Sequence, residues 1–263
     1  MKILKHQIRI FCLLLQTKFA TINRVLTDKS IDFYIWEVCT LLVSGYLMQS
    51  FGLSSDYGPF QLGSILASLG LFEMYGNAIT LISDIEGERV ISYYLTIPTN
   101  AITVLSSYVF YYTIINTIIT IVAIPIAKII LLDKFILANV AWLQLLLFIV
   151  LMNFVCATAT LLFSAFIPSI DKVGRIWMRI IFPLWFLGGF NFSWFSVNAK
   201  IPWISYFMLL NPITYMTEGI RAALIGQDGN LNFWLCCVVL TITFGVTSIL
   251  AYKALKKRLD FVG

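Results

Sequence analysis

The chain has 263 residues, of which 60% are hydrophobic, 15% aromatic and only 12% charged, and its formal net charge is +5. The mean hydropathy is +0.89, and a single soluble core of this length cannot hide so much apolar surface. The composition therefore excludes an ordinary soluble domain. It predicts an all-α polytopic membrane protein whose basic excess suits anionic lipid rather than nucleic acid.

Residues 1–32 are expected to form an amphipathic helix at the membrane surface. Basic residues alternate there with apolar ones, which is typical of helices that lie in the interface. The basic positions are Lys2, Lys5, Arg9, Lys18, Arg24 and Lys29. A poorly ordered tail is the alternative interpretation of the same segment.

Six apolar stretches follow, and each crossing of the hydrocarbon core needs roughly 20 mostly apolar residues. The stretches lie at 33–53, 60–83, 101–125, 139–167, 174–190 and 231–252. The fifth carries Arg179 and Pro183 and ends in two glycines, so a bent helix fits it better than a straight one. We expect six transmembrane helices in a single transmembrane domain over 1–263.

Basic residues near the ends of the crossings predict the orientation, because Lys and Arg are retained on the cytoplasmic side. With the N-terminus inside, most of the 18 Lys and Arg fall on one face, including those of the tail at 253–263. The exceptions are Lys128, Lys134, Lys200 and Arg221. Both termini are therefore expected in the cytoplasm, in a multi-pass protein of a plasma membrane or bacterial inner membrane.

The loop at 84–100, DIEGERVISYYLTIPTN, interrupts the apolar chain with a cluster of charges. Ser83 followed three residues later by Glu86 fits a capping box, and Pro98 prevents a helix from continuing. The loop is therefore predicted to contain a short cytoplasmic helix.

Such a helix would carry an acidic front and a stripe of aromatic and aliphatic side chains at i, i+3 and i+4. An anionic leaflet repels the acidic front, which favours docking on a soluble partner over lying flat on the membrane. The residues expected to contact that partner are Glu86, Glu88, Ile91, Tyr94 and Leu95.

The extracellular segment 191–230 contains the sequence NPITYMTEGIRAALIG at 211–226. Asn211 is a good N-cap, Pro212 suits the first helical position and Gly226 is a plausible stop. The predicted helix is too short to cross the membrane. With the aromatic residues before it, the segment is expected to dip into the outer leaflet as broken, re-entrant helices.

Together these two segments resemble the type-2 ABC exporter permeases, the membrane-spanning subunits of ATP-driven exporters. The resemblance covers nearly the whole chain in length, number of crossings and loop placement. NPITYMTEGIRAALIG is similar to the Asn-Pro, aromatic, Glu, Arg signature that precedes the last crossing in that family. DIEGERVISYYLTIPTNAITVLSSY is similar to its acidic, Gly-containing cytoplasmic loop with a Pro before the third crossing.

The resemblance implies an N-terminal interfacial helix, six membrane helices, a coupling helix over residues 86–95 and re-entrant extracellular helices before the last crossing. It implies that two permeases pair, as a homodimer in preference to a heterodimer, with two ATP-binding subunits that hold ATP and Mg²⁺. It also implies a structural or gating role for the extracellular motif residues, which are Asn211, Pro212, Tyr215, Glu218 and Arg221.

The sequence offers no catalytic, cofactor or metal site of its own. No Gly-Lys pair occurs, so the chain has no P-loop, and ATP hydrolysis is expected in a separate subunit. His6 is the one histidine, and the five cysteines do not fall at ligand spacing.

Ionisable residues within or near the expected crossings are costly, at roughly 2.5–3.5 kcal/mol each on insertion scales. Glu73 lies about mid-crossing, where it lines a pathway, pairs across a dimer or bonds to a neighbouring Tyr or Asn. Glu37 is expected to pair with Arg179 as a structural contact, and a place on the translocation pathway is the alternative for both residues. Glu218 and Arg221 can meet on one helix face, as a structural pair, a gate or a solvated pair of little energetic consequence.

These observations favour the permease subunit of an ATP-driven exporter, which forms with a second permease the path for an amphipathic, glycan or lipid-linked substrate. An ATP-independent carrier or channel is the first alternative. A polytopic lipid-modifying enzyme is the second, but it would need clustered acidic or histidine residues at the membrane surface. Membrane lipids are the other expected partners, and nucleic acid is not expected.

Overall fold

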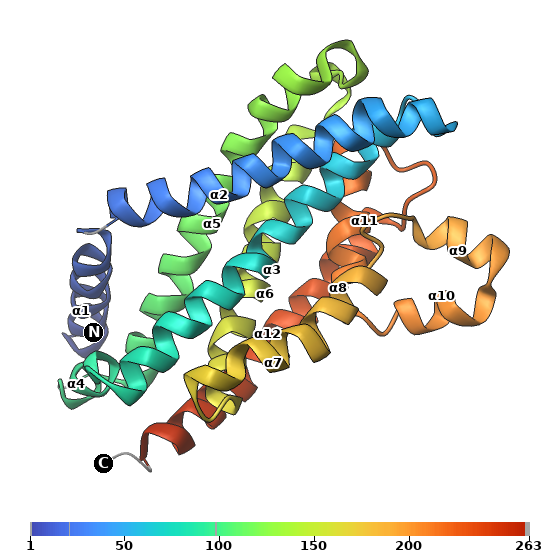
Figure 1. Ribbon diagram of the computed structural model, residues 1–263. Helices are drawn as coiled ribbons and strands as arrows, with labels where there is room; N and C mark the ends of the chain where they lie inside the picture. Colours follow the sequence, from blue (N-terminus) through green and yellow to red (C-terminus); the bar gives the residue numbers. More distant parts are fainter. Residues whose placement is uncertain (1, 21, 98, 261–263) are drawn as a thin grey trace.

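The computed structural model describes residues 2–20, 22–97 and 99–260, so Pro98 and the last three residues of the tail lie outside the described parts. The described residues form a bundle of helices joined by short turns (Figure 1). The expected all-α, polytopic class is confirmed, because the described residues contain five helices that are long and apolar enough to cross a membrane.

These five helices form the body of the bundle. The first combines α2 (Ile22–Leu42), a π-helical segment η1 (Val43–Leu47) and a 3₁₀ turn η2 (Met48–Phe51). The others are α3 (Tyr57–Glu86), α5 (Ala101–Leu131), α6 (Trp142–Phe166) and α12 (Phe233–Asp260). Small residues allow close packing between them: Gly70 lies against Asn153 and Cys156, and Gly219 of α11 (Pro212–Ile225) lies against the ring of Phe148.

The N-terminal segment differs from the single surface helix expected over 1–32. It forms a separate helix, α1 (Lys2–Phe19), and α2 already begins at Ile22. The candidate membrane span starts at Lys29 rather than at residue 33. Helix α1 packs along α5, where the rings of Phe11 and Phe110 meet edge-on with centroids 5.3 Å apart.

The fifth expected crossing, 174–190, is not among the five long helices of the described chain. It is a broken run of α7 (Val173–Ile176), a π-helical segment η6 (Trp177–Ile181) and α8 (Phe182–Leu187). At 1.5 Å per residue the run spans about 22 Å, short of the roughly 30 Å hydrocarbon core. Two features limit it: Pro183 removes a helix donor next to the π-helical segment, and Gly189 adopts a positive φ of 87° just beyond α8.

The chain between α6 and α12 nevertheless leads from one end of the bundle to the other. At one end, Arg258 of α12 donates to the carbonyl of Ile167, 2.5 Å away, just past α6. At the other, the N–H of Ala141 before α6 donates to Ala223 of α11, 2.9 Å away. Between these ends lie the broken run, the short helices α9 (Trp194–Lys200) and α10 (Pro202–Met208), and α11.

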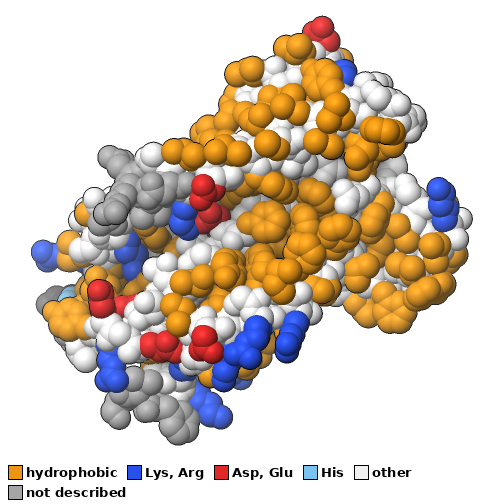
Figure 2. Space-filling model, viewed as in Figure 1, with side chains coloured by type: hydrophobic (Ala, Val, Ile, Leu, Met, Phe, Trp, Pro, Cys, Tyr) orange, Lys and Arg blue, Asp and Glu red, His pale blue; other side chains and the backbone are white. Residues whose placement is uncertain are grey.

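The first of these ends also holds the short helix α4 (Val90–Thr96), and we call it the α4 end. The beginning of α1 lies there too, because Gln7 accepts a hydrogen bond from Thr99 at 2.6 Å (Figure 1). Figure 2 shows acidic and basic side chains gathered at this end, while hydrophobic side chains cover most of the rest of the visible face. The two described ends of the chain are therefore on the same side of the bundle.

Candidate functional site

A groove runs between α2 and α3 on one face of the bundle. At its α4-end half, a cavity of about 450 Å³ is lined by Lys29, Asp32, Trp36, Phe72 and Glu73, among others. Lys29 forms an ion pair with Glu73 and also donates to Asn77 at 2.7 Å. Glu73 therefore has an intrachain partner from the neighbouring helix, which was not among its expected partners.

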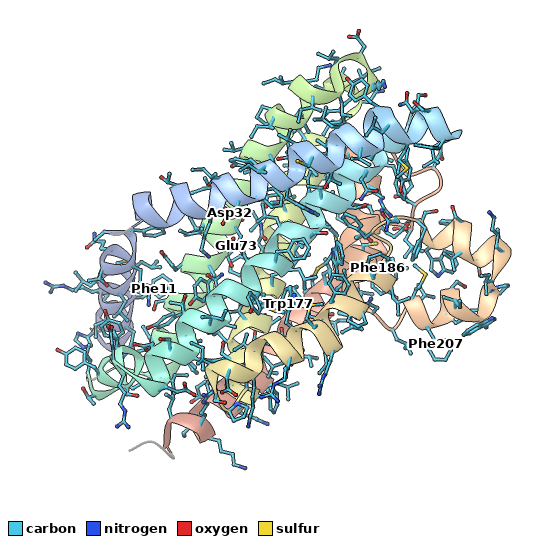
Figure 3. The ribbon with its side chains drawn as sticks, viewed as in Figure 1. Phe11, Asp32, Glu73, Trp177, Phe186 and Phe207 are labelled. Carbon is cyan, nitrogen blue, oxygen red and sulfur yellow. The ribbon has the colours of Figure 1, made fainter. Side chains whose placement is uncertain are left out.

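Aromatic rings form the middle of this groove. Trp36 meets Phe72 edge-on with ring centroids 5.2 Å apart, and Phe72 lies 5.2 Å from Trp185 of α8. Trp177 of η6 lies 5.2 Å from the ring of Tyr75. Rings from α2, α3 and the broken run thus form one continuous wall, and Figure 3 shows Trp177 on the run that borders α3.

A second cavity of about 280 Å³ continues the groove away from the α4 end. It is lined by Thr40, Ser44, Tyr57, Gln61 and Phe190, among others. The ring of Phe190 stacks 6.0 Å from that of Trp36, which lines the first cavity. We refer to the two cavities and the rings between them as the α2–α3 groove: charged at one end, aromatic in the middle and uncharged but polar at the other.

The helix that continues from α2 and the broken run each contain a π-helical turn near this groove. Val43 and Ser44 of η1 line the second cavity, and Trp177 of η6 belongs to the aromatic wall. Single π-turns inside α-helices are rare and occur frequently at functional sites. The groove is therefore bordered by two segments that depart from regular α-helical geometry, η1 after α2 and η6 in the broken run.

The expected pairing of Glu37 with Arg179 is wrong. Glu37 is fully buried, and neither of its carboxyl oxygens has a hydrogen-bond partner among the described residues. Arg179 is exposed on η6. The prediction failed because helical position alone does not fix which face of α2 meets the rest of the bundle, and Glu37 shares its face with the core residues Phe33 and Leu41.

The second site is the turn that joins α3 to α4. The carboxylate of Asp84 accepts hydrogen bonds from the N–H groups of Val90 and Ile91, each at 2.9 Å. Arg89 precedes α4 with a φ of 56°, an uncommon conformation for a residue with a side chain. The expected capping box of Ser83 and Glu86 does not start a helix, because α3 continues through both positions and Asp84 satisfies the first turn of α4 instead.

The stripe expected to dock on a partner faces the protein itself. Ile91 is fully buried, and Tyr94 and Leu95 pack against the same group of side chains. That group, which we call the α4 cluster, contains Leu14, Ile85, Ile91, Val104, Tyr108 and Leu255. It joins α4 to α1, α3, α5 and α12.

The outward side of the turn and of α4 carries a different set of residues. Glu86, Glu88 and Arg89 are exposed, and Tyr93 exposes 66% of its surface. A Tyr this exposed beside two exposed carboxylates is a surface suited to a protein partner, since Tyr is enriched in binding interfaces. Of the five expected contact residues, only Glu86 and Glu88 lie on the outward side.

Helix α1 contacts the α4 region at two places. The side chain of Gln7 accepts from the hydroxyls of Thr99 and Thr103, at 2.6 and 2.8 Å, where α5 begins. The ammonium group of Lys18 lies 3.0 Å from the ring centroid of Tyr108 and 5.6 Å from that of Tyr94. Burial lowers the pKa of Lys18 to about 7, although the charge of Asp84 acts to raise it.

The third site is α11, which follows the sequence expectation closely. Asn211 caps the helix by accepting from the N–H of Ile213 at 3.1 Å, and its amide donates to Leu184 at 2.6 Å. Pro212 is the first helical residue, and Gly226 follows the last with a φ of 110°. The hydroxyl of Tyr215 donates to the carbonyl of Leu209 at 2.9 Å.

Arg221 and Glu218 form a fully buried pair on α11, 3.6 Å apart, so the solvated alternative is wrong. The guanidinium group donates to Ser64, to backbone carbonyls including Gly189 at 2.5 Å, and lies over the ring of Phe60. Glu218 accepts from the N–H groups of Trp194 at 2.8 Å and Leu231 at 2.9 Å. The pair therefore joins α11 to α3, α9 and the start of α12.

Sequence reasoning missed Lys29, Asp32 and Trp36 of the groove because they fall within or beside the segment assigned to the surface helix. It missed Asp84 as a cap because the bonded N–H groups lie six and seven residues further on. A turn signal was present in Gly87, which lies between the two helices.

Comparison with known proteins gives one family. A family model described as "ABC-2 type transporter" matches residues 14–225, which include α2, α3, α4 and α11. No curated protein matches the chain.

Proposed function

The chain belongs to the ABC-2 type transporter family, and from this premise we propose that it pairs with a second copy to form the path of an ATP-driven exporter. The family match makes it a multi-pass membrane permease subunit. The proposed substrate is an amphipathic, glycan or lipid-linked molecule, and the proposed path is the α2–α3 groove.

Energy comes from another polypeptide in this proposal. ABC-2 permeases function with ATP-binding subunits, and their membrane domain lacks a catalytic nucleotide-binding domain. ATP and Mg²⁺ are bound by those subunits. We propose two of them per pair of permeases, one for each α4.

The observation that carries the proposal is the two-sided environment of α4. Its inner side is fixed to the bundle by Ile91 and by the hydrogen bonds of Asp84. Its outer side presents Glu86, Glu88 and Tyr93. A helix held by the membrane part on one side and open on the other is suited to transmit the movement of a docked ATPase.

The orientation follows from this assignment. The α4 end faces the cytoplasm, which places both termini there, in a plasma membrane or bacterial inner membrane. The basic residues Lys253, Lys256 and Lys257 near the end of α12 support this side, since basic residues are retained in the cytoplasm. The opposite end, with α9 and α10, lies outside.

Six crossings are proposed, although five helices in the described part of the chain have the length of a complete span. The broken run of α7, η6 and α8 starts near the cytoplasmic end, and the chain returns through α12 from the opposite end. The run therefore carries the chain from the cytoplasmic side towards the outside, and α9, α10 and α11 complete the passage as re-entrant helices. Non-helical backbone at this depth is tolerated where protein covers it.

The proposed mechanism couples these parts in order. ATP-driven closure of the ATPases pushes α4, and Asp84 passes the movement to α3 while the α4 cluster passes it to α5. Helix α3 forms one wall of the groove, so its displacement against α2 opens or closes the path. The π-helical turns provide places where two segments beside the groove can bend: η1 in the helix that continues from α2, and η6 in the broken run.

Purification tests the proposal. The tagged chain is extracted from its native membrane into nanodiscs, the proteins recovered with it are identified, and ATP hydrolysis is measured. A P-loop ATPase in roughly equal amount, with hydrolysis, is the expected result. Recovery of the chain alone, with substrate movement in proteoliposomes that lack ATP, would replace the proposal with an ATP-independent carrier.

A further inference from the structure

We propose that the α4-end cavity of the α2–α3 groove binds an amphipathic organic cation, and that molecules of this class are substrates. The claim that these cations are transported rests on the proposed function, whereas the binding site is inferred from its own geometry. Three observations carry it: the charge balance of the cavity, its aromatic wall and the accessibility of both.

Among the described residues that line the cavity, two are acidic and one is basic. Lys29 is neutralised by Glu73, with which it forms an ion pair. Asp32 lines the same cavity, is exposed, and has no ion-pair or hydrogen-bond partner among the described residues. Figure 3 shows Asp32 on α2 and Glu73 on α3 next to each other on the face of the groove. Arg179 on the broken run does not line the cavity.

Aromatic rings adjoin this carboxylate. Trp36 is one turn from Asp32 on α2, and Phe72 and Tyr75 flank Glu73 on α3; all three rings line the cavity and are half-buried. The face of an aromatic ring attracts a cation within about 6 Å of its centroid, and the attraction grows when the cation is desolvated. A carboxylate beside several rings therefore favours a cation with an apolar body over a neutral or anionic molecule.

Size and accessibility agree with such a ligand. The cavity volume of about 450 Å³ falls within the roughly 300–1,000 Å³ of small-molecule sites. The side chains of the ion pair keep 24% (Lys29) and 15% (Glu73) of their surface exposed, so a ligand can reach them. Figure 2 shows this charged group at the edge of a hydrophobic area, so the polar and apolar parts of one molecule can contact different surfaces.

The test compares two probes of matched shape and opposite charge. The full chain is placed in nanodiscs of neutral phosphatidylcholine, without ATPase or nucleotide, and equilibrium dialysis measures the binding of tetraphenylphosphonium and tetraphenylborate over empty nanodiscs. Saturable binding of tetraphenylphosphonium, at least tenfold tighter than any binding of tetraphenylborate, is expected. Equal binding of the two ions, or no saturable binding of the cation, would overturn the proposal.

Variants locate the site. Asp32→Asn and Trp36→Leu are each expected to weaken binding of tetraphenylphosphonium about tenfold, which corresponds to about 1.4 kcal/mol. Asp133→Asn and Trp142→Leu, which change exposed residues away from the groove, are the matched controls and leave binding unchanged. Unaltered affinity in a monodisperse Asp32→Asn protein would place the cation elsewhere and overturn the assignment.

The outcome is separable from that of the proposed function. If purification recovers no ATPase but the cation still binds selectively, the binding site stands and its role in ATP-driven export does not. If the ATPase is recovered but the cation does not bind selectively, the exporter function stands and organic cations are excluded as its substrates.

Discussion

The carboxylate of Asp84 in the last turn of α3 accepts a hydrogen bond from the backbone N–H of Ile91 in the first turn of α4, at 2.9 Å. The same carboxylate accepts from Val90, also at 2.9 Å. One side chain of a membrane-spanning helix thus holds the start of the helix proposed to contact the ATPase. Because these bonds join the two helices directly, they give α4 a fixed position relative to the α2–α3 groove.

Replacing Asp84 with Ala is expected to loosen α4 without unfolding the bundle. Loss of a helix cap costs about 0.5–2 kcal/mol, and Asn, which keeps one acceptor oxygen, should give a smaller effect. Hydrogen exchange over residues 90–96 measures the change. Exchange in this segment should rise at least several-fold in Asp84→Ala, while exchange in α6 stays as in the unaltered chain.

A control for charge alone is Asp133→Asn, which neutralises an exposed carboxylate far from α4 along the chain. This variant should leave exchange in residues 90–96 unchanged. Protection of α4 that stayed intact in Asp84→Ala would mean that the buried Ile91 face holds the helix by itself.

Arg221→Met is expected to be among the most damaging substitutions in the chain. It leaves Glu218 buried without its partner and frees the carbonyls of Gly189 and Phe190, a change that costs about 3–5 kcal/mol for buried pairs. Arg221→Lys should rescue little, because an ammonium group lacks the planar fork of donors. Thermal unfolding of the protein in nanodiscs measures both.

The matched comparison is Arg175→Met, which breaks an exposed ion pair with Asp171, 3.3 Å away. Exposed pairs contribute about 0–1 kcal/mol, so the unfolding temperature should hardly move. Similar shifts for the two Arg→Met variants would contradict the structural role assigned to Arg221.

The ion pair of Lys29 and Glu73 should show coupling. Glu73→Gln removes the charge that pairs with the Lys29 ammonium and leaves its hydrogen bond to Asn77. We expect a loss of about 1–2 kcal/mol in the free energy of unfolding, below the value for fully buried pairs because both side chains are partly exposed. The double variant Lys29→Met/Glu73→Gln removes both charges and should recover part of the loss. Strictly additive unfolding temperatures would show that the two residues do not interact.

Lys18 gives a dependence on pH. Burial lowers its pKa in the folded protein from 10.5 to about 7, so between these values the unfolded state holds a proton that the folded state has lost. Stability should therefore rise with pH from about 7 towards 10.5. Hydrogen exchange over residues 5–19 measures this, and Lys18→Met should flatten the pH profile. A profile that falls over this range, or that Lys18→Met leaves unchanged, would contradict the low pKa.

The sequence was most informative where local chemistry alone decides structure. The bounds of α11 follow from Asn211 as cap, Pro212 as first residue and Gly226 as stop, all of which act within a few residues of the chain. The helical spacing of Ile91, Tyr94 and Leu95 likewise predicted that they share a face. It could not tell whether that face meets the bundle or a partner, because apolar side chains suit both.

Contacts between distant segments explain the remaining differences. The sequence placed Lys29 in a helix at the membrane surface. Its ion pair with Glu73 could not be seen there, because Glu73 is on another helix. The buried environment of Arg221 depends on Ser64 and Gly189, which no motif around α11 reveals. The stretch expected as a fifth crossing is a short, broken run because of Pro183 and the π-helical turn before it, and its apolar composition did not indicate this length.

The central claim is that the outward side of α4 contacts the ATPase, and site-specific photo-cross-linking tests it most directly. p-Benzoylphenylalanine is introduced at Tyr93, 66% exposed on α4, and as a control at Ile102, 52% exposed near the start of α5. After irradiation in the native membrane, position 93 should yield a cross-link to a P-loop ATPase and position 102 should not. Absence of this cross-link from position 93, or equal yields from both positions, would contradict the account.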